Sequence, residues 1–166
     1  KRELVRLLED RHREIRSAAI MGMENFPGPE TVNLLLNYLQ KHPDRDTTYW
    51  VAITLPKCGA TEAAVPVLAA QLATCDLSVY PHLVGALRLL GGEAATDALI
   101  AALEQRDFTH YESCRWQGYG ALAQMSGPKV AAALARGSRD ANIFQRKACV
   151  HGLAQLADPA TSAALQ

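Results

Sequence analysis

Residues 16–26 read RSAAIMGMENF, residues 115–125 read RWQGYGALAQM and residues 146–156 read RKACVHGLAQL. Residues 48–58 and 80–90 follow the same spacing of apolar residues, so one segment occurs five times. The large apolar residue that can be aligned across the five copies is the anchor of each repeat. The anchors are Met23, Leu55, Leu87, Leu122 and Leu153, and successive anchors lie 32, 32, 35 and 31 residues apart. A period of that length is typical of a solenoid, in which each unit packs only on its neighbours.

Each repeat is expected to be a pair of short antiparallel helices. Shorter apolar segments at helical spacing, such as residues 32–39, lie between the anchor segments. Turn signals such as Gly91-Gly92 and Gly127-Pro128 separate the helices. An aspartate precedes each anchor helix, where its side chain can cap the first amides. These aspartates are Asp10, Asp46, Asp76, Asp107 and Asp140. The sequence therefore predicts an all-α solenoid of about five helix pairs.

The repeats are expected to form a single domain. Their approximate boundaries are 1–27, 28–59, 60–91, 92–126 and 127–157, followed by a partial repeat at 158–166 in which a new helix starts at Pro159. Neither end carries an obvious polar cap, although the terminal repeats of a solenoid must hide their apolar faces. We therefore expect either a piece of a longer array or an end that packs on something else.

The composition argues against several classes of function. Lys plus Arg and Asp plus Glu number 17 each, so no excess of positive charge attracts nucleic acid or an anionic membrane. No apolar run approaches the roughly 20 residues that span a bilayer. The four cysteines and five histidines are dispersed without metal-ligand spacing, which favours buried free thiols. We expect a cytoplasmic protein with no membrane partner, no metal and no cofactor, and we find no catalytic pair.

Two stretches carry a family resemblance, LVRLLEDRHREIRSAAIMGM near one end and AALARGSRDANIFQRKACVHGL near the other. An apolar segment followed by Asp, and six residues later by Arg, resembles the HEAT repeats, in particular the short variety of phycobilin lyase-type proteins. The resemblance implies a right-handed α-α superhelix whose Arg-bearing helices line the concave surface. It also implies a stacked polar ladder with Asp10, Arg16, Asp140 and Arg146 as members.

The middle of the chain departs from this pattern. The five repeats have Arg16, Thr48, Tyr80, Arg115 and Arg146 at the ladder position. Repeats two and three therefore lack the cation, and repeat four lacks an Asp six residues before its Arg. Aromatic residues appear beside these positions, among them Tyr49-Trp50 and Trp116.

Helix geometry places part of this aromatic set on an exposed face. At about 100° per residue, the positions six and two before the anchor and one after it point away from the core. In the central repeats these positions hold Tyr49, Ile53, Pro56, Pro81, Gly85, Arg88, Trp116, Gly120 and Ala123. In the outer repeats they hold Ser17, Met21, Glu24, Lys147, His151 and Ala154. An exposed apolar and aromatic stripe is typical of an interaction surface.

The expected binding residues follow from this stripe and its flanks. They are Tyr49, Trp50, Ile53, Tyr80, His82, Arg115, Trp116 and Tyr119. Trp50, Tyr80 and His82 are expected to be half-buried on the flanks. Three alternatives stay open. The tryptophans could instead fill gaps between helices, and Gly85 and Gly120 could serve helix packing. Residues 106–113 (RDFTHYES) could form a loop that joins the site or only the start of the next helix.

The sequence favours a non-catalytic module that presents a concave aromatic surface to a protein or peptide. A second hypothesis, from the resemblance, is a bilin lyase or chaperone subunit in which Arg88 and Arg115 flank a small flat ligand. A third is a nucleic-acid-binding solenoid, which the scarcity of cations on the central helices disfavours. The His-Glu dipeptides of iron-dependent HEAT hydroxylases do not occur in the chain.

Overall fold

The computed structural model describes residues 1–157, and all regular structure in this range is helical. The α-helices are α1 (Arg2–Leu7), α2 (Arg13–Gly22), α3 (Pro29–Lys41), α4 (Arg45–Lys57), α5 (Val65–Thr74), α6 (Tyr80–Leu90), α7 (Gly92–Gln105), α8 (Glu112–Leu122), α9 (Pro128–Gly137) and α10 (Ile143–Ala157). Short 3-10 turns, Met23–Asn25 and Glu62–Ala64, extend α2 and precede α5. The prediction of an all-α HEAT-like solenoid of about five helix pairs is confirmed. The expected partial repeat at 158–166 lies outside the described residues.

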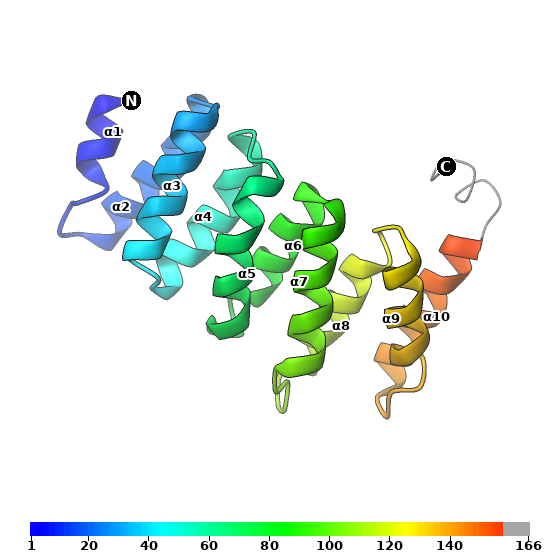
Figure 1. Ribbon diagram of the computed structural model, residues 1–166. Coiled ribbons are helices and arrows are strands. Elements are labelled where there is room, and N and C mark those ends of the chain that lie inside the picture. Colours follow the sequence, from blue (N-terminus) through cyan, green and yellow to red (C-terminus); the bar gives the residue numbers. More distant parts are fainter. Residues whose placement is uncertain (158–166) are drawn as a thin grey trace.

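The helices form two layers that follow the chain from one end of the molecule to the other (Figure 1). The first layer contains the first helix of each pair, α1, α3, α5, α7 and α9. The second contains the anchor helices, α2, α4, α6, α8 and α10. Each anchor helix packs closely on the next along the whole array, whereas α1, α3 and α5 are more widely spaced. Since the inner side of a curved double layer is the more closely packed, the anchor helices form the concave side.

The anchor residues hold the two layers together. Met23, Leu55, Leu87 and Leu122 are completely buried, whereas Leu153 in the last pair is half-buried. They belong to one apolar core that runs through the pairs and includes leucines of the first layer, such as Leu35, Leu68 and Leu99. Burying one such side chain contributes about 1.5–3 kcal/mol, so the repeated anchor is a major source of stability.

Aspartates shape the turns that lead into the anchor helices. The carboxylates of Asp10, Asp76 and Asp107 each accept the backbone N–H of the residue two positions later, at 2.7–2.8 Å. These bonds fix the turn rather than the first amides of the helix. Because α2, α6 and α8 have no side-chain cap hydrogen bond, the helix capping expected from the sequence is wrong at these three aspartates. In the second repeat the sequence-based choice of Asp46 is wrong. Asp44 is the N-cap of α4 and accepts the backbone N–H of Thr47 at 3.0 Å. Like α2, α8 and α10, α4 begins ten residues before its anchor, so Asp46, nine residues before Leu55, lies inside the helix.

Polar contacts across the array join neighbouring repeats. The Tyr38 hydroxyl donates to the Leu8 carbonyl at 2.7 Å, and the Arg106 guanidinium donates to the Leu72 carbonyl at 2.6 Å. On the surface, Lys57 pairs with Glu24 at 2.6 Å. Each of these contacts spans about one repeat in sequence. The described part of the chain therefore behaves as a stack of nearest neighbours.

Some helix glycines lie where two helices touch and others face open space. Substitutions at one glycine of each kind test the packing of α10 on α8. A Cβ added to Gly152 would lie 2.6 Å from the Cβ of Ala123, whereas one added to Gly85 would meet nothing within 4 Å. We expect Gly152→Ala to destabilise the fold by about 1–2 kcal/mol, because α8 and α10 would have to separate. Gly85→Ala, the matched control, should stabilise it by about 0.5–1 kcal/mol. Urea unfolding followed by circular dichroism measures both; equal effects would contradict the close approach of α8 and α10.

The turn aspartates predict how the unfolding free energy changes with pH. The hydrogen bond from Ser78 holds the pKa of Asp76 below its usual value, and those from His12 and Thr109 do the same for Asp10 and Asp107. A carboxyl group with a lowered folded-state pKa stabilises the fold above its unfolded pKa of about 3.9, and this contribution disappears as the pH falls through the folded pKa. The unfolding free energy should therefore be level near neutral pH and fall below about pH 4.

Asp76→Asn is the control for this pH dependence, because its amide oxygen can still accept the turn hydrogen bond but cannot titrate. We expect the variant to lose less stability on acidification than the parent. Urea midpoints measured between about pH 3 and pH 7 make the comparison. An identical acid slope in the two proteins would show that the Asp76 turn contributes nothing.

Candidate functional site

The solvent side of the anchor helices has the composition that the helical spacing predicts. None of the residues six or two positions before the anchor, or one after it, is buried in any of the five repeats. On α4, α6 and α8 this side carries aromatic, aliphatic and glycine residues, and Arg88 is its single charged member at these positions. An apolar strip on the concave layer therefore crosses three neighbouring repeats. We call the nine residues at these positions the inner strip. They are Tyr49, Ile53, Pro56, Pro81, Gly85, Arg88, Trp116, Gly120 and Ala123.

An aromatic cluster marks the α4–α6 end of the inner strip. The ring of Tyr49 lies edge-on to that of Trp50, with centroids 4.8 Å apart, and contacts the His82 ring at 4.3 Å. All three side chains are half-buried. Trp50 also packs on the core, whereas Tyr49 faces outward. Partial burial lowers the pKa of His82, which keeps its imidazole neutral near pH 7.

Two glycines with open space above them lie at the centre of the inner strip. Gly85 on α6 and Gly120 on α8 occupy the same position in adjacent repeats, and a Cβ added to either would meet nothing within 4 Å. These glycines therefore do not serve helix packing, which was one of the two explanations left open by the sequence. A glycine inside a helix costs about 1 kcal/mol relative to alanine, and no neighbouring atom compensates for it here.

Trp116 marks the α8 end of the strip and is 48% exposed, so it does not fill a gap between helices. Beside it lies a shallow depression of about 350 Å³ lined by Glu112, Ser113, Trp116, Asn142 and Phe144. Phe144, on the first turn of α10, is 67% exposed. Two large aromatic side chains from adjacent repeats therefore border one hollow.

Sequence reasoning missed Phe144 and Leu89, although both face solvent on the same side as the inner strip. They lie nine residues before and two residues after their anchors, at about 180° and 200° around the helix from the core. Leu89 is 62% exposed. Adding the positions nine before and two after the anchor to the same helical count would have found them.

Tyr80 is not a surface residue, so its assignment to the binding site is wrong. Its side chain is completely buried. The connection between α7 and α8 covers it: the Phe108 ring lies edge-on at 5.3 Å, and the Arg106 guanidinium lies 5.6 Å from the ring centre. The longer fourth repeat supplies both residues, and helix periodicity alone does not reveal where that connection folds.

Tyr119 is also buried, which corrects its assignment. It lies three residues before its anchor, on the flank of α8 that meets the next repeat. A Cβ added to Gly137 would lie 2.6 Å from the Tyr119 ring. The absence of a side chain at Gly137 therefore leaves room for the tyrosine between the repeats.

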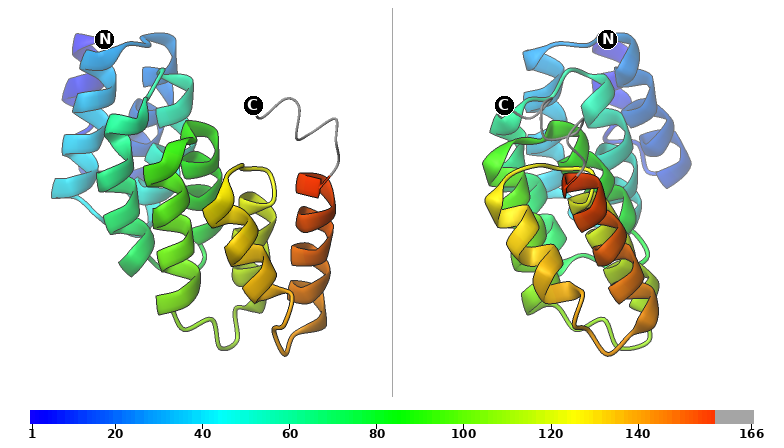
Figure 2. Two further views of the ribbon diagram at one scale, coloured as in Figure 1. Left: turned by 45° about the vertical axis from the view of Figure 1, so that its right-hand side comes forward. Right: turned by 90° about the vertical axis from the view of Figure 1, so that its right-hand side faces the viewer.

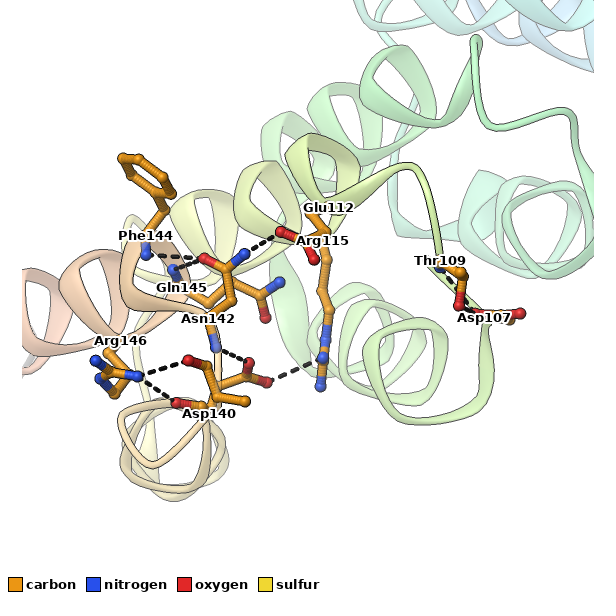
Figure 3. Close-up of polar contacts among 10 residues, drawn as sticks. Asp107, Thr109, Glu112, Arg115, Asp140, Asn142, Phe144, Gln145 and Arg146 are labelled. Atoms are coloured by element: carbon orange, nitrogen blue, oxygen red, sulfur yellow. Dashed lines mark hydrogen bonds and ion pairs between the residues drawn. The ribbon is translucent and has the colours of Figure 1, made fainter.

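Arg115 is engaged inside the protein rather than free for a partner. Its guanidinium pairs with the Asp140 carboxylate of the next repeat at 2.9 Å, and Figure 3 shows the two side chains pointing toward each other. The sequence showed no Asp six residues before Arg115, and the partner comes instead from the following repeat. This ion pair joins adjacent repeats, as the ladder of the resembling family implies.

Asp140 is the centre of a polar network at the turn into α10 (Figure 3). Its carboxylate also accepts the Asn142 backbone N–H at 2.9 Å. The Asn142 side chain in turn caps α10, accepting the Phe144 N–H at 2.8 Å, and donates to Glu112. These contacts fix the position of Phe144 beside the hollow.

The predicted ladder residues act through backbone carbonyls at both ends of the chain. Arg146 donates to the carbonyl oxygens of Asp140 and Ala141 at 2.9 and 2.8 Å. Arg16 donates in the same way to the carbonyls of Asp10 and Arg11 at 2.9 and 3.2 Å. In both pairs the arginine braces the turn, and the aspartate carboxylate is directed elsewhere.

The site offers contact surface and charge rather than activated nucleophiles. Burial raises the pKa of Cys58, Cys75 and Cys114, and raises that of Cys149 to about 11, so these thiols are protonated at neutral pH. Within residues 1–157, no group of three or more His, Cys, Asp and Glu side chains is placed to hold a metal ion. None of the helices in that range combines the length and apolar character that crossing a bilayer requires.

The fold and the inner strip define an α-solenoid with an apolar concave surface. A family model described as HEAT repeats matches residues 2–80, which supports a place among HEAT-repeat proteins. The match is to HEAT repeats in general, so the phycobilin lyase-type subtype stays a prediction. Comparison with curated proteins finds no significant match. Among solved structures, human deoxyhypusine hydroxylase in complex with glycerol is 19% identical, with 91% of this chain and 71% of that chain covered and a TM-score of 0.33. A similarity of this size carries no argument about function.

The Asp140 network can be tested by substitution. Asp140→Ala removes the partner of Arg115 and the acceptor of the Asn142 amide, so we expect a loss of about 1–3 kcal/mol in unfolding free energy. Asp97→Ala is the control, because its exposed carboxylate pairs with Lys129 at 2.9 Å on the surface. That change should stay within about 0.5 kcal/mol. Urea unfolding of the two variants decides the point, and equal losses would argue against a stabilising role for the network.

Proposed function

We propose that the chain is a non-catalytic scaffold module that binds a protein or peptide along the inner strip of α4, α6 and α8. The observation that supports this most is that large apolar side chains face solvent across neighbouring repeats of the concave layer. Trp116 is about half exposed, and Tyr49 and Ile53 are partly exposed in the same strip. Aromatic residues offer a large contact area with few torsions to freeze, which suits them to binding sites.

The two glycines of the inner strip favour an extended segment as the ligand. A Cβ added to Gly85 or Gly120 would meet nothing within 4 Å, so a polypeptide backbone can approach α6 and α8 closely at these positions. The aromatic rings of Tyr49 and Trp116, which lie six residues before their anchors, would then contact side chains of the segment. Solenoid proteins commonly bind their partners on an extended concave surface of this kind.

Charge narrows the choice of segment. Arg88 and Lys147 lie on the solvent side of α6 and α10, and within residues 1–157 neither forms an ion pair. The carboxylates of Glu24 and Asp140 already pair with Lys57 and Arg115. A segment that carries carboxylates near Arg88 and Lys147 would therefore bind more favourably than a basic one.

The polar network favours the peptide over the bilin alternative. That alternative uses Arg88 and Arg115 to hold the propionate groups of a flat tetrapyrrole. Arg115 already pairs with Asp140 at 2.9 Å, so one of the two cations is committed within the protein. Nucleic acid is disfavoured by the single unpaired cation, Arg88, in the inner strip.

Binding can be tested by capture from a source lysate with three variants beside the parent. Tyr49→Ala with Trp116→Ala removes the aromatic contacts, and we expect the captured partner to be lost with an affinity decrease of about 30-fold or more. Gly120→Leu places a side chain in the open space above α8 without meeting the core and should also weaken binding. Circular dichroism verifies that both variants keep their helix content.

Tyr111→Ala is the matched aromatic control, because Tyr111 is 49% exposed but lies in the α7–α8 connection. Its binding should equal that of the parent. If the folded inner-strip variants bind like the parent while Tyr111→Ala does not, the site lies on the connection and the proposal is wrong. If added bilin is bound with visible absorbance and no polypeptide is captured, the chromophore alternative replaces it.

A further inference from the structure

A shallow hollow joins the first turns of α8 and α10. The two helices begin at the same end of the molecule and pack on each other (Figure 2). The hollow has a volume of about 350 Å³ and is bordered by Trp116 and Phe144, which are 48% and 67% exposed. Pockets for small ligands commonly begin at about 300 Å³, so there is room for one long side chain. Contact with the outward ring of Trp116 alone would leave this hollow empty.

Glu112 gives the hollow a negative charge. Of the five described residues that line it, Glu112 is the one with a charged side chain. One carboxylate oxygen accepts a hydrogen bond from the Asn142 side-chain amide. Within residues 1–157 the other oxygen, Oε1, has no hydrogen-bond partner, and the carboxylate forms no ion pair. The hollow therefore presents a charged acceptor that a ligand can match.

The polar network at the turn into α10 fixes the position of this carboxylate. The Asn142 backbone N–H donates to Asp140 at 2.9 Å, and the Asn142 side-chain oxygen accepts the Phe144 backbone N–H at 2.8 Å. In Figure 3 the Asn142 amide lies between Glu112 and the backbone of Phe144. The neighbouring cation, Arg115, pairs with Asp140 and so does not neutralise Glu112. A ligand therefore meets a carboxylate that is already oriented, which lowers the cost of ordering on binding.

We propose that this hollow binds an arginine side chain of the polypeptide partner. The guanidinium would stack on the ring of Trp116 or Phe144 and donate to Oε1 of Glu112. A guanidinium is planar, stacks on aromatic faces and presents its donors in a fixed fork that matches a carboxylate. One side chain thus satisfies both the rings and the charge. That the arginine belongs to a polypeptide rests on the proposed function.

Other side chains match the hollow less well. An apolar side chain would cover the Glu112 carboxylate without pairing it, and desolvating an unpaired charge is costly. An acidic side chain would be repelled, and the compact, strongly hydrated ammonium of lysine has no planar face to stack. Lys147 lies three residues beyond Phe144 on α10 and does not line the hollow. An arginine in the hollow and a carboxylate beside Lys147 therefore suit one segment of mixed charge.

Nuclear magnetic resonance of the full chain tests the hollow directly. The probes are N-acetyl-arginine amide, its uncharged analogue of the same shape, N-acetyl-citrulline amide, and N-acetyl-lysine amide. We expect the indole N–H signal of Trp116, assigned with Trp116→Phe, to shift and saturate with a Kd of about 1–10 mM for the arginine probe. The signal of Trp50, at the α4 end of the inner strip, should not move. The citrulline and lysine probes should bind at least about threefold more weakly.

Substitutions identify the groups that hold the arginine. Glu112→Gln keeps an acceptor for the Asn142 amide but loses the charge, so the arginine probe should bind about three- to tenfold more weakly. Phe144→Ala should weaken it as well. Glu104→Gln is the matched control, because that exposed carboxylate lies on α7 and pairs with Arg136. Its affinity for the probe should equal that of the parent. Circular dichroism verifies native helix content in each variant.

Several results would overturn this proposal. They are an unmoved Trp116 signal at about 100 mM arginine probe, a citrulline or lysine probe that binds as tightly, and unchanged affinity in Glu112→Gln. Capture from a lysate separates this inference from the proposed function. If the arginine probe binds but no polypeptide is captured, the hollow is an arginine site and the peptide proposal is wrong. If a captured partner is held equally by the parent and Glu112→Gln, the proposed function stands and the arginine assignment is wrong.

Discussion

A single helix pair of this length cannot cover its own apolar face, and this constraint shapes the rest of the molecule. The anchor side chain is completely buried in the four pairs that a following pair covers, as at Met23, Leu55 and Leu122. The half-buried Leu153 shows the same dependence, because no described helix covers the far side of α10. Stability is therefore shared between repeats and rests on nearest-neighbour interfaces. The flanks of the anchor helices are constrained, whereas their solvent side is not.

That freedom explains why the candidate site lies where it does. The positions that face solvent on the concave layer contribute nothing to stacking, so their side chains can change without harming the fold. In the outer repeats they hold polar residues such as Ser17 and Lys147, and in the central repeats they hold Tyr49 and Trp116. The same side carries two glycines with open space above them. A surface that pays a helix-stability cost and exposes large rings has no explanation in the packing of the fold.

Periodicity was sufficient to predict the fold, the anchors and the exposure of the inner strip, because these depend on local helix geometry. It failed where contacts depend on the exact approach of two repeats. Tyr80 is buried by Phe108 from a connection whose course no periodic rule describes, and Tyr119 is buried because Gly137 leaves it room. The partner of Arg115 lies in the following repeat, beyond the local spacing of Asp and Arg that the family pattern uses. Such errors fall on the flanks of the helices, where neighbouring elements decide burial.

The arginines connect these local departures with the irregular period. At the first and last turns, Arg16 and Arg146 brace carbonyl oxygens of their own repeat. Repeat three has Tyr80 at that position, yet the carbonyls of Leu72 and Cys75 still receive a guanidinium, that of Arg106 from the next repeat, at 2.6 and 2.7 Å. Arg106 of the longer fourth repeat thus replaces the arginine that repeat three lacks. Phe108 of the same connection covers Tyr80, which occupies the position of that arginine. Unsatisfied buried carbonyls are costly, so the loss of the arginine in repeat three is compensated by Arg106 from the insertion in repeat four. The turn therefore keeps a guanidinium that binds its carbonyl oxygens, although the Asp and Arg pattern in the sequence is lost.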